Sequence, residues 1–82
     1  MTDALVLETT YRIAEKIKGA PLRSSEKNEI MDFYGKISGS RYERAKEAMA
    51  RILHMDQDLL KEKAEANKDV RKLLEELETY GI

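Results

Sequence analysis

Apolar residues recur at helical spacing through the second half of the chain, from Ser40 to Tyr80. Steps of three and four residues join them into one series, which two charged residues, Asp56 and Lys63, interrupt. The apolar members of this series are Tyr42, Ala45, Met49, Ile52, Leu59, Ala66, Val70, Leu73, Leu77 and Tyr80. The spacing predicts amphipathic helices whose apolar stripe packs against another surface, as in a coiled coil.

A shorter amphipathic segment begins the chain. Val6 and Ile13 fall on one side of a helix predicted over residues 3–18. Gly19 and Pro21 are expected to end it, because glycine adopts the left-handed C-terminal conformation and proline disfavours helical geometry in the residue before it.

A second helix is predicted over residues 25–38, with Ile30 and Tyr34 on its apolar face. Ser24 or Ser25 is the expected N-cap, since a serine hydroxyl accepts a hydrogen bond from the first turn of a helix. Gly39 is the expected stop.

Ser40 and Glu43 have the spacing of a capping box, which predicts the start of a third helix over residues 40–54. Two continuations are open. Either Asp56 caps a separate helix over residues 57–80, or the chain runs on as one rod over 40–80. The sequence favours the break, because a rod would place Asp56 and Lys63 in its apolar stripe, where unpaired charges are costly.

These segments predict an all-α fold: one domain over residues 1–82, built as a small bundle of three to four helices with a long C-terminal amphipathic helix. The chain has 82 residues and no cysteine. A chain this short buries a thin core, and no disulfide or thiolate metal site reinforces it. Self-association is therefore expected.

Charge and hydropathy narrow the class of protein. Charged residues make up 38% of the chain, yet the formal net charge is −1, which does not favour a general polyanion binder. No apolar stretch approaches the roughly 20 residues needed to span a bilayer. The first residues lack the basic segment of a secretion signal, so we expect a cytoplasmic protein.

No grouping of residues predicts catalysis. His54, the only histidine, suggests a general base or a pH sensor, but its helical projection points away from the apolar stripe and favours an ordinary surface residue. The serines lie where helix caps are needed. No metal-ligand spacing or nucleotide-binding loop is present, and we expect a non-enzymatic protein without metal or cofactor.

One local excess of positive charge lies between Lys36 and Arg51, with aromatic residues nearby. Its bases are Lys36, Arg41, Arg44, Lys46 and Arg51, against the acids Glu43 and Glu47. A cluster of this kind can bind phosphates. A solvated helix face is the favoured interpretation, since Glu47 and Arg51 have the order of a favourable ion pair.

The order of segments resembles the small four-helix bacteriocin immunity proteins. The resemblance rests on Tyr11 in the first helix, Pro21 in the link, Ser24-Ser25-Glu26 opening the second helix and the stretch Leu73-Leu74-Glu75-Glu76-Leu77. It implies a four-helix protein of the bacteriocin-immunity type. Phe33-Tyr34 followed by a basic helix is also similar to helical small subunits of nucleoprotein complexes.

The function expected from these observations is protein–protein interaction through the C-terminal stripe, as a homo-oligomer or as a small adaptor or regulatory subunit. The residues predicted to bind the partner are Leu59, Val70, Leu73, Leu77 and Tyr80. There are two alternatives: a nucleic-acid-associated helical protein that uses the basic residues of the 36–51 segment, and a four-helix protein of the bacteriocin-immunity type, as the resemblance implies.

Overall fold

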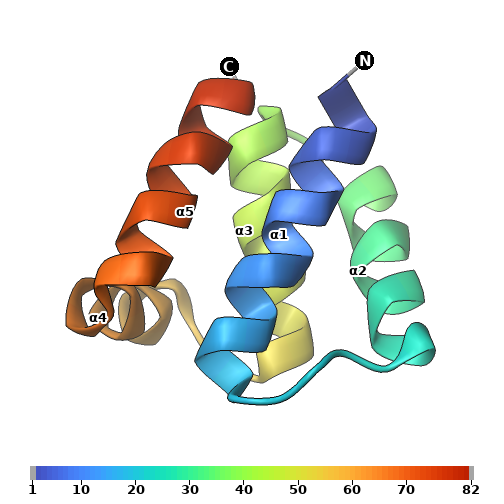
Figure 1. The fold of residues 1–82 in the computed structure, drawn as a ribbon. Coiled ribbons are helices and arrows are strands. Elements are labelled where there is room, and N and C mark those ends of the chain that lie inside the picture. The colour runs from blue at the N-terminus through green and yellow to red at the C-terminus, as the bar shows by residue number, and fades with distance from the viewer. Residues whose placement is uncertain (1, 82) are drawn as a thin grey trace.

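Figure 1 shows five helices in residues 2–81, the part of the chain that the computed structural model describes. They are α1 (Thr2–Lys18), α2 (Ser24–Lys36), α3 (Arg41–Leu53), α4 (Gln57–Ala66) and α5 (Lys68–Tyr80). Helix α3 contacts the other four. Helices α1, α2 and α5 run alongside it, and α4 lies crosswise at one end (Figure 1). The predicted all-α class is confirmed.

The central position of α3 follows from its small side chains. Ala45, Ala48 and Ala50 are buried together with Met49. Because alanine carries only a methyl group, helices on several sides can approach the α3 backbone closely, and Met49 fills the space that remains.

Helix α1 contributes Val6 and Ile13 to the core. Two threonines on the same helix are also buried, and each satisfies its hydroxyl locally. Thr9 Oγ1 donates to the Leu5 carbonyl at 2.9 Å, and Thr10 Oγ1 donates to the Val6 carbonyl at 2.7 Å. No buried hydroxyl of this helix is left without an acceptor in the described structure, so burying the threonines carries little polar cost.

The predicted end of the first helix is confirmed. Gly19 has φ +77°, and its N–H donates to the Glu15 carbonyl at 2.8 Å. Leu22 then folds back into the core, where it is 7% exposed. Its N–H donates to Glu15 Oε2 at 2.9 Å, so one glutamate fixes both the helix end and the connection.

The start of α2 differs from the prediction. Ser24 and Ser25 lie inside the first turn, and Arg23 occupies the N-cap position. The cap is made by Glu26, whose Oε1 accepts from the Arg23 N–H at 2.8 Å. The helix also ends at Lys36 rather than at residue 38, because the next residue adopts an extended backbone.

The predicted break between the third and fourth segments is confirmed, and the rod is excluded. Ser40 caps α3 by accepting from the Glu43 N–H at 3.1 Å. His54, in the left-handed conformation with φ 57°, follows its last residue. Asp56 then caps α4 by accepting from the Leu59 N–H at 2.8 Å.

The long C-terminal helix is a wrong prediction, since residues 57–80 form two helices. Asn67 separates them with an extended backbone, φ −127° and ψ 113°. Its Oδ1 accepts from the N–H groups of Asp69 and Val70 at 2.9 and 3.3 Å. An asparagine that caps the next helix in this way competes with continuation of the preceding one.

This break also changes which residues α4 buries. Leu60 and Ala64 are 1% and 4% exposed, whereas Leu59 is 38% exposed and Ala66 is exposed. The predicted stripe ran through Leu59 and Ala66 because it assumed one helical register from residue 57 to residue 80.

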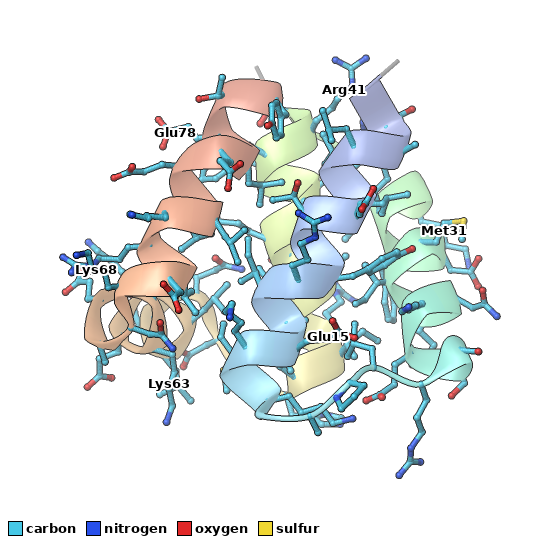
Figure 2. The ribbon with its side chains drawn as sticks, in the orientation of Figure 1. Glu15, Met31, Arg41, Lys63, Lys68 and Glu78 are labelled. Carbon is cyan, nitrogen blue, oxygen red and sulfur yellow. The ribbon has the colours of Figure 1, made fainter. Side chains whose placement is uncertain are left out.

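Gly81 ends α5, as predicted, and brings it close to the start of α3. A Cβ atom added to Gly81 would lie 2.6 Å from the Tyr42 backbone nitrogen. Only a residue without a side chain allows this approach. The end of α5 therefore lies on the same side of the bundle as the starts of α1 and α3, as Figure 1 shows. In Figure 2, Glu78 near the end of α5 and Arg41 at the start of α3 are both on this side.

Candidate protein-binding groove

A groove of about 470 Å³ lies where α3, α4 and α5 meet. Its lining residues are Tyr42 and Lys46 from α3, Gln57, Asp58, Leu60, Lys61, Ala64 and Glu65 from α4, and Arg71, Leu74 and Glu75 from α5. We call this the C-terminal groove. It exists because α4 turns across the bundle after Asp56 instead of continuing along α3.

The floor of the C-terminal groove is apolar. Leu60 and Ala64 are buried, and Leu74 and Tyr42 are half-buried. Burial raises the pKa of the Tyr42 hydroxyl, and the negative charge of Glu78 adds to this effect. The Tyr42 hydroxyl thus stays protonated to a higher pH than an exposed tyrosine and remains a neutral hydrogen-bond donor.

Polar contacts hold the α3 side of the groove in place. The Lys46 ammonium lies 4.6 Å from the centre of the Tyr42 ring, within cation–π distance. Gln57 Nε2 donates to the Lys46 carbonyl at 3.3 Å, which joins the first residue of α4 to α3.

Six charged side chains line the groove, and they carry equal numbers of each sign. The bases are Lys46, Lys61 and Arg71, and the acids are Asp58, Glu65 and Glu75. None of the six belongs to an ion pair within residues 2–81. Arg71 and Glu75 have the spacing of an intrahelical pair, but their charged groups do not come within ion-pair distance in the described structure.

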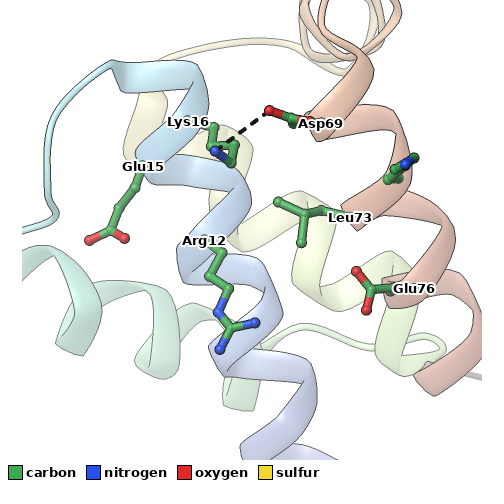
Figure 3. Close-up of a pocket in the computed structure, with 7 residues that line it drawn as sticks. Arg12, Glu15, Lys16, Asp69, Leu73 and Glu76 are labelled. Carbon is green, nitrogen blue, oxygen red and sulfur yellow. Dashed lines mark ion pairs between the residues drawn. The ribbon is translucent and has the colours of Figure 1, made fainter.

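A second, larger depression of about 810 Å³ lies between α1 and α5 and is more open to solvent. Figure 3 shows that it is lined mainly by charged side chains. Several of these already have partners: Lys16 pairs with Asp69 at 3.9 Å, Arg12 pairs with Glu8 at 2.9 Å, and Glu15 accepts from the Leu22 N–H. The C-terminal groove, with its unpaired charges and apolar floor, is the better candidate for binding a protein.

The structure separates the residues that were predicted to bind a partner. Val70 and Leu77 are 0% exposed and belong to the core of the chain itself. Leu73 and Tyr80 are half-buried, and Leu73 lines the α1–α5 depression. Leu59 is exposed on α4. None of these five residues lines the C-terminal groove, and a partner could reach Val70 or Leu77 only by opening the bundle.

Most side chains of the predicted basic cluster already contact other residues of the chain. Arg41 Nε donates to Asp3 Oδ1 at 3.1 Å. Arg51 pairs with Glu47 at 3.4 Å, and its guanidinium lies 5.2 Å from the centre of the Phe33 ring. Lys46 lies over Tyr42, as described above. Lys36 is exposed and has no ion-pair partner within residues 2–81.

Arg44, the remaining base of the cluster, is stacked on Tyr34. The guanidinium carbon lies 4.4 Å from the ring centre, and two of its nitrogens donate to the carbonyl and the hydroxyl oxygen of Tyr34 at 3.3 and 3.4 Å. The Arg44 Nε is buried without an acceptor in the described structure. The side chain is thus positioned against Tyr34 rather than directed into solvent.

Asp3 connects this pair to α1. Its Oδ1 accepts from the Tyr34 hydroxyl at 2.8 Å as well as from Arg41. The hydrogen bonds from Tyr34 and Arg41 lower the pKa of the Asp3 carboxyl below its usual 3.8. Burial, followed by the negative Asp3, raises the pKa of the Tyr34 hydroxyl above 10.0. A single carboxylate therefore links α1, α2 and α3.

His54 is exposed, as expected for a surface histidine. No group of three histidine, cysteine or acidic side chains within residues 2–81 has the arrangement of a metal site. None of the five helices described above has both the length and the apolar composition to cross a bilayer.

Comparison with known proteins adds no assignment. No family model matches the chain, and neither the curated proteins nor the solved structures contain a match.

Proposed function

We propose that this chain is a non-enzymatic protein-interaction module, an adaptor or small regulatory subunit that binds its partner through the C-terminal groove. The observation that carries the proposal is the combination of an apolar floor with six charged side chains that lack ion-pair partners within residues 2–81. Protein interfaces have this composition: an apolar centre that excludes water, and a polar rim that selects the partner and its orientation.

The location of the groove also supports the proposal. It is formed by the C-terminal half of the chain, as the sequence pattern suggested, but by side chains that the pattern did not select. Leu60 and Ala64 hold α4 against the bundle, and Leu74 is the half-buried apolar residue that a partner would cover.

Two matched charge reversals test this function. Lys61→Glu changes the rim of the groove, and Lys36→Glu makes the same change in charge on an exposed residue of α2. Each variant and the wild-type chain are used as bait in an extract of the organism that encodes the chain. Retained proteins are identified by mass spectrometry, and the mass of each bait is measured in solution.

We expect a protein, or a further copy of the chain, that is retained by the wild type and by Lys36→Glu. Its retention by Lys61→Glu should fall by roughly tenfold, since a reversed rim charge repels the group that it previously attracted. Equal retention by all three baits would contradict the proposal, and so would a monomeric bait that retains no protein.

A further inference from the structure

The charges of the C-terminal groove restrict what can cover it. A purely acidic partner would leave Asp58, Glu65 and Glu75 facing like charges, and a purely basic partner would do the same to Lys46, Lys61 and Arg71. Like charges brought together at an interface are costly. The covering surface must therefore offer both signs in about equal number.

A second copy of the same groove meets this requirement. In a dimer with two-fold symmetry the same patch occurs on both chains, so it must be complementary to itself. The groove has three bases and three acids without ion-pair partners in the described chain. The bases of one copy can therefore pair with the acids of the other. All five ion pairs of residues 2–81 lie outside the groove, so pairing across a dimer would break none of them.

The spacing on α5 suggests how two copies would meet. Arg71 and Glu75 are exposed one helical turn apart on α5, and Leu74, on the adjacent side of the helix, is half-buried. If two α5 helices run antiparallel across a two-fold axis, Arg71 of each copy faces Glu75 of the other, and the two Leu74 side chains meet near the axis.

We propose that the C-terminal groove is the interface of a homodimer, in which Arg71 of one copy pairs with Glu75 of the second copy. This inference rests on the proposed function, since it uses the same groove and names the partner. A groove of this size on a small chain buries little surface, so the expected dissociation constant is about 10–100 µM.

Sedimentation equilibrium on the full chain tests the proposal. The wild type should approach twice the 9.5 kDa mass of one chain at about 500 µM. Arg71→Glu and Glu75→Arg should each weaken the dimer by roughly tenfold or more, because one substitution creates two repulsive pairs across the axis. The double variant Arg71→Glu/Glu75→Arg should restore dimerisation, since both pairs re-form with reversed signs.

Lys36→Glu is the matched control and should dimerise like the wild type. Far-UV circular dichroism on each variant shows that the helices are retained, as expected for exposed positions. A monomeric wild type at about 500 µM would overturn the inference. A dimer that the single reversals leave unchanged, or that the double variant fails to restore, would overturn it as well.

The two proposals fail in different ways. A monomeric chain that still retains another protein, with loss in Lys61→Glu, rejects the homodimer and leaves the proposed function in place. A dimer that is insensitive to Arg71, Glu75 and Lys61 rejects both proposals, because association would then use another surface.

Discussion

Asp3 is an exposed residue near the start of the chain, yet its carboxylate accepts hydrogen bonds from two other helices. Tyr34 and Arg41 donate to it at 2.8 and 3.1 Å. These contacts are stronger with the ionised carboxylate, which is why its pKa falls below 3.8. A group whose pKa is lower in the folded state contributes stability above its unfolded pKa and loses it as the pH falls through the folded value.

Asp3→Asn should therefore lower the free energy of unfolding at pH 7, where the stabilisation by the charged carboxylate is fully present. The difference from the wild type should narrow as the pH falls below 3.8 and through the lower folded pKa. Urea unfolding of both proteins, followed by circular dichroism at several pH values, measures this difference in the free energy of unfolding. Asp32→Asn, at an exposed position of α2, is the control. A loss of stability that is the same at every pH would contradict this account.

His54 is the only non-glycine residue in residues 2–81 with a positive φ. Its neighbours fix this conformation: the His54 and Met55 N–H groups donate to carbonyls in the last turn of α3 at 3.2 and 2.9 Å. The left-handed region is costly for residues with a Cβ atom and accessible to glycine.

We expect His54→Gly to stabilise the chain by about 0.5–1 kcal/mol. Glycine relieves the backbone strain at this position, and the greater conformational entropy of glycine in the unfolded chain offsets part of that gain. Gly19→Ala is the reverse experiment, because φ there is +77° and no heavy atom lies within 4 Å of an added Cβ. It should destabilise by about 1 kcal/mol. Thermal unfolding measures both changes, and a destabilised His54→Gly would show that the imidazole makes a favourable contact.

At the scale of whole elements, the division between α4 and α5 decides the shape of the C-terminal groove. Capping residues define each boundary after α2: Ser40, Asp56 and Asn67 all accept hydrogen bonds from the first turn of the helix that follows. Capping chemistry predicted the first two boundaries. The third was missed because the apolar spacing continues through Asn67, although Asn67 followed by Asp69 is itself a helix-start signal.

Asn67→Ala should destabilise the chain by about 1 kcal/mol, since it removes the acceptor for the Asp69 and Val70 N–H groups. It should also favour a continuous helix through residue 67, visible as a gain in amide protection there by hydrogen exchange. Asn28→Ala, at an exposed position inside α2, is the control. An Asn67→Ala variant as stable as the wild type would mean that packing, not the cap, sets the boundary.

At the scale of the whole molecule, much of the fold was predictable and most of the groove was not. The helix ends at Gly19 and Gly81 follow from local chemistry, and so does the burial of Ile30 and Tyr34. The burial of Leu60 in place of Leu59 does not follow from local chemistry. It depends on the break at Asn67, which allows α4 to rotate and cross the bundle. The groove depends on that crossing.

The basic cluster illustrates the same limit. The sequence shows its excess of positive charge, but not that Arg44 stacks on Tyr34 or that Arg41 donates to Asp3. These partners lie on other helices and only the tertiary structure brings them together. A basic side chain that is already bound within the fold contributes less to the binding of a phosphate.

We therefore expect weak nucleic-acid binding, with a dissociation constant above about 100 µM for a mixed oligonucleotide pool at physiological salt. Fluorescence anisotropy at two salt concentrations measures it. Tight, salt-sensitive binding that is lost in an Arg41→Glu/Arg51→Glu variant would contradict the expectation and favour the nucleic-acid function.

Both proposals depend on association of this chain through the C-terminal groove. A photo-crosslinking residue placed in turn at position 61, on the rim of the groove, and at position 36, on α2, tests it directly. We expect a crosslinked product, to a second copy or to another protein, from position 61 and none from position 36. Crosslinking from position 36 alone, or equally from both, would contradict it.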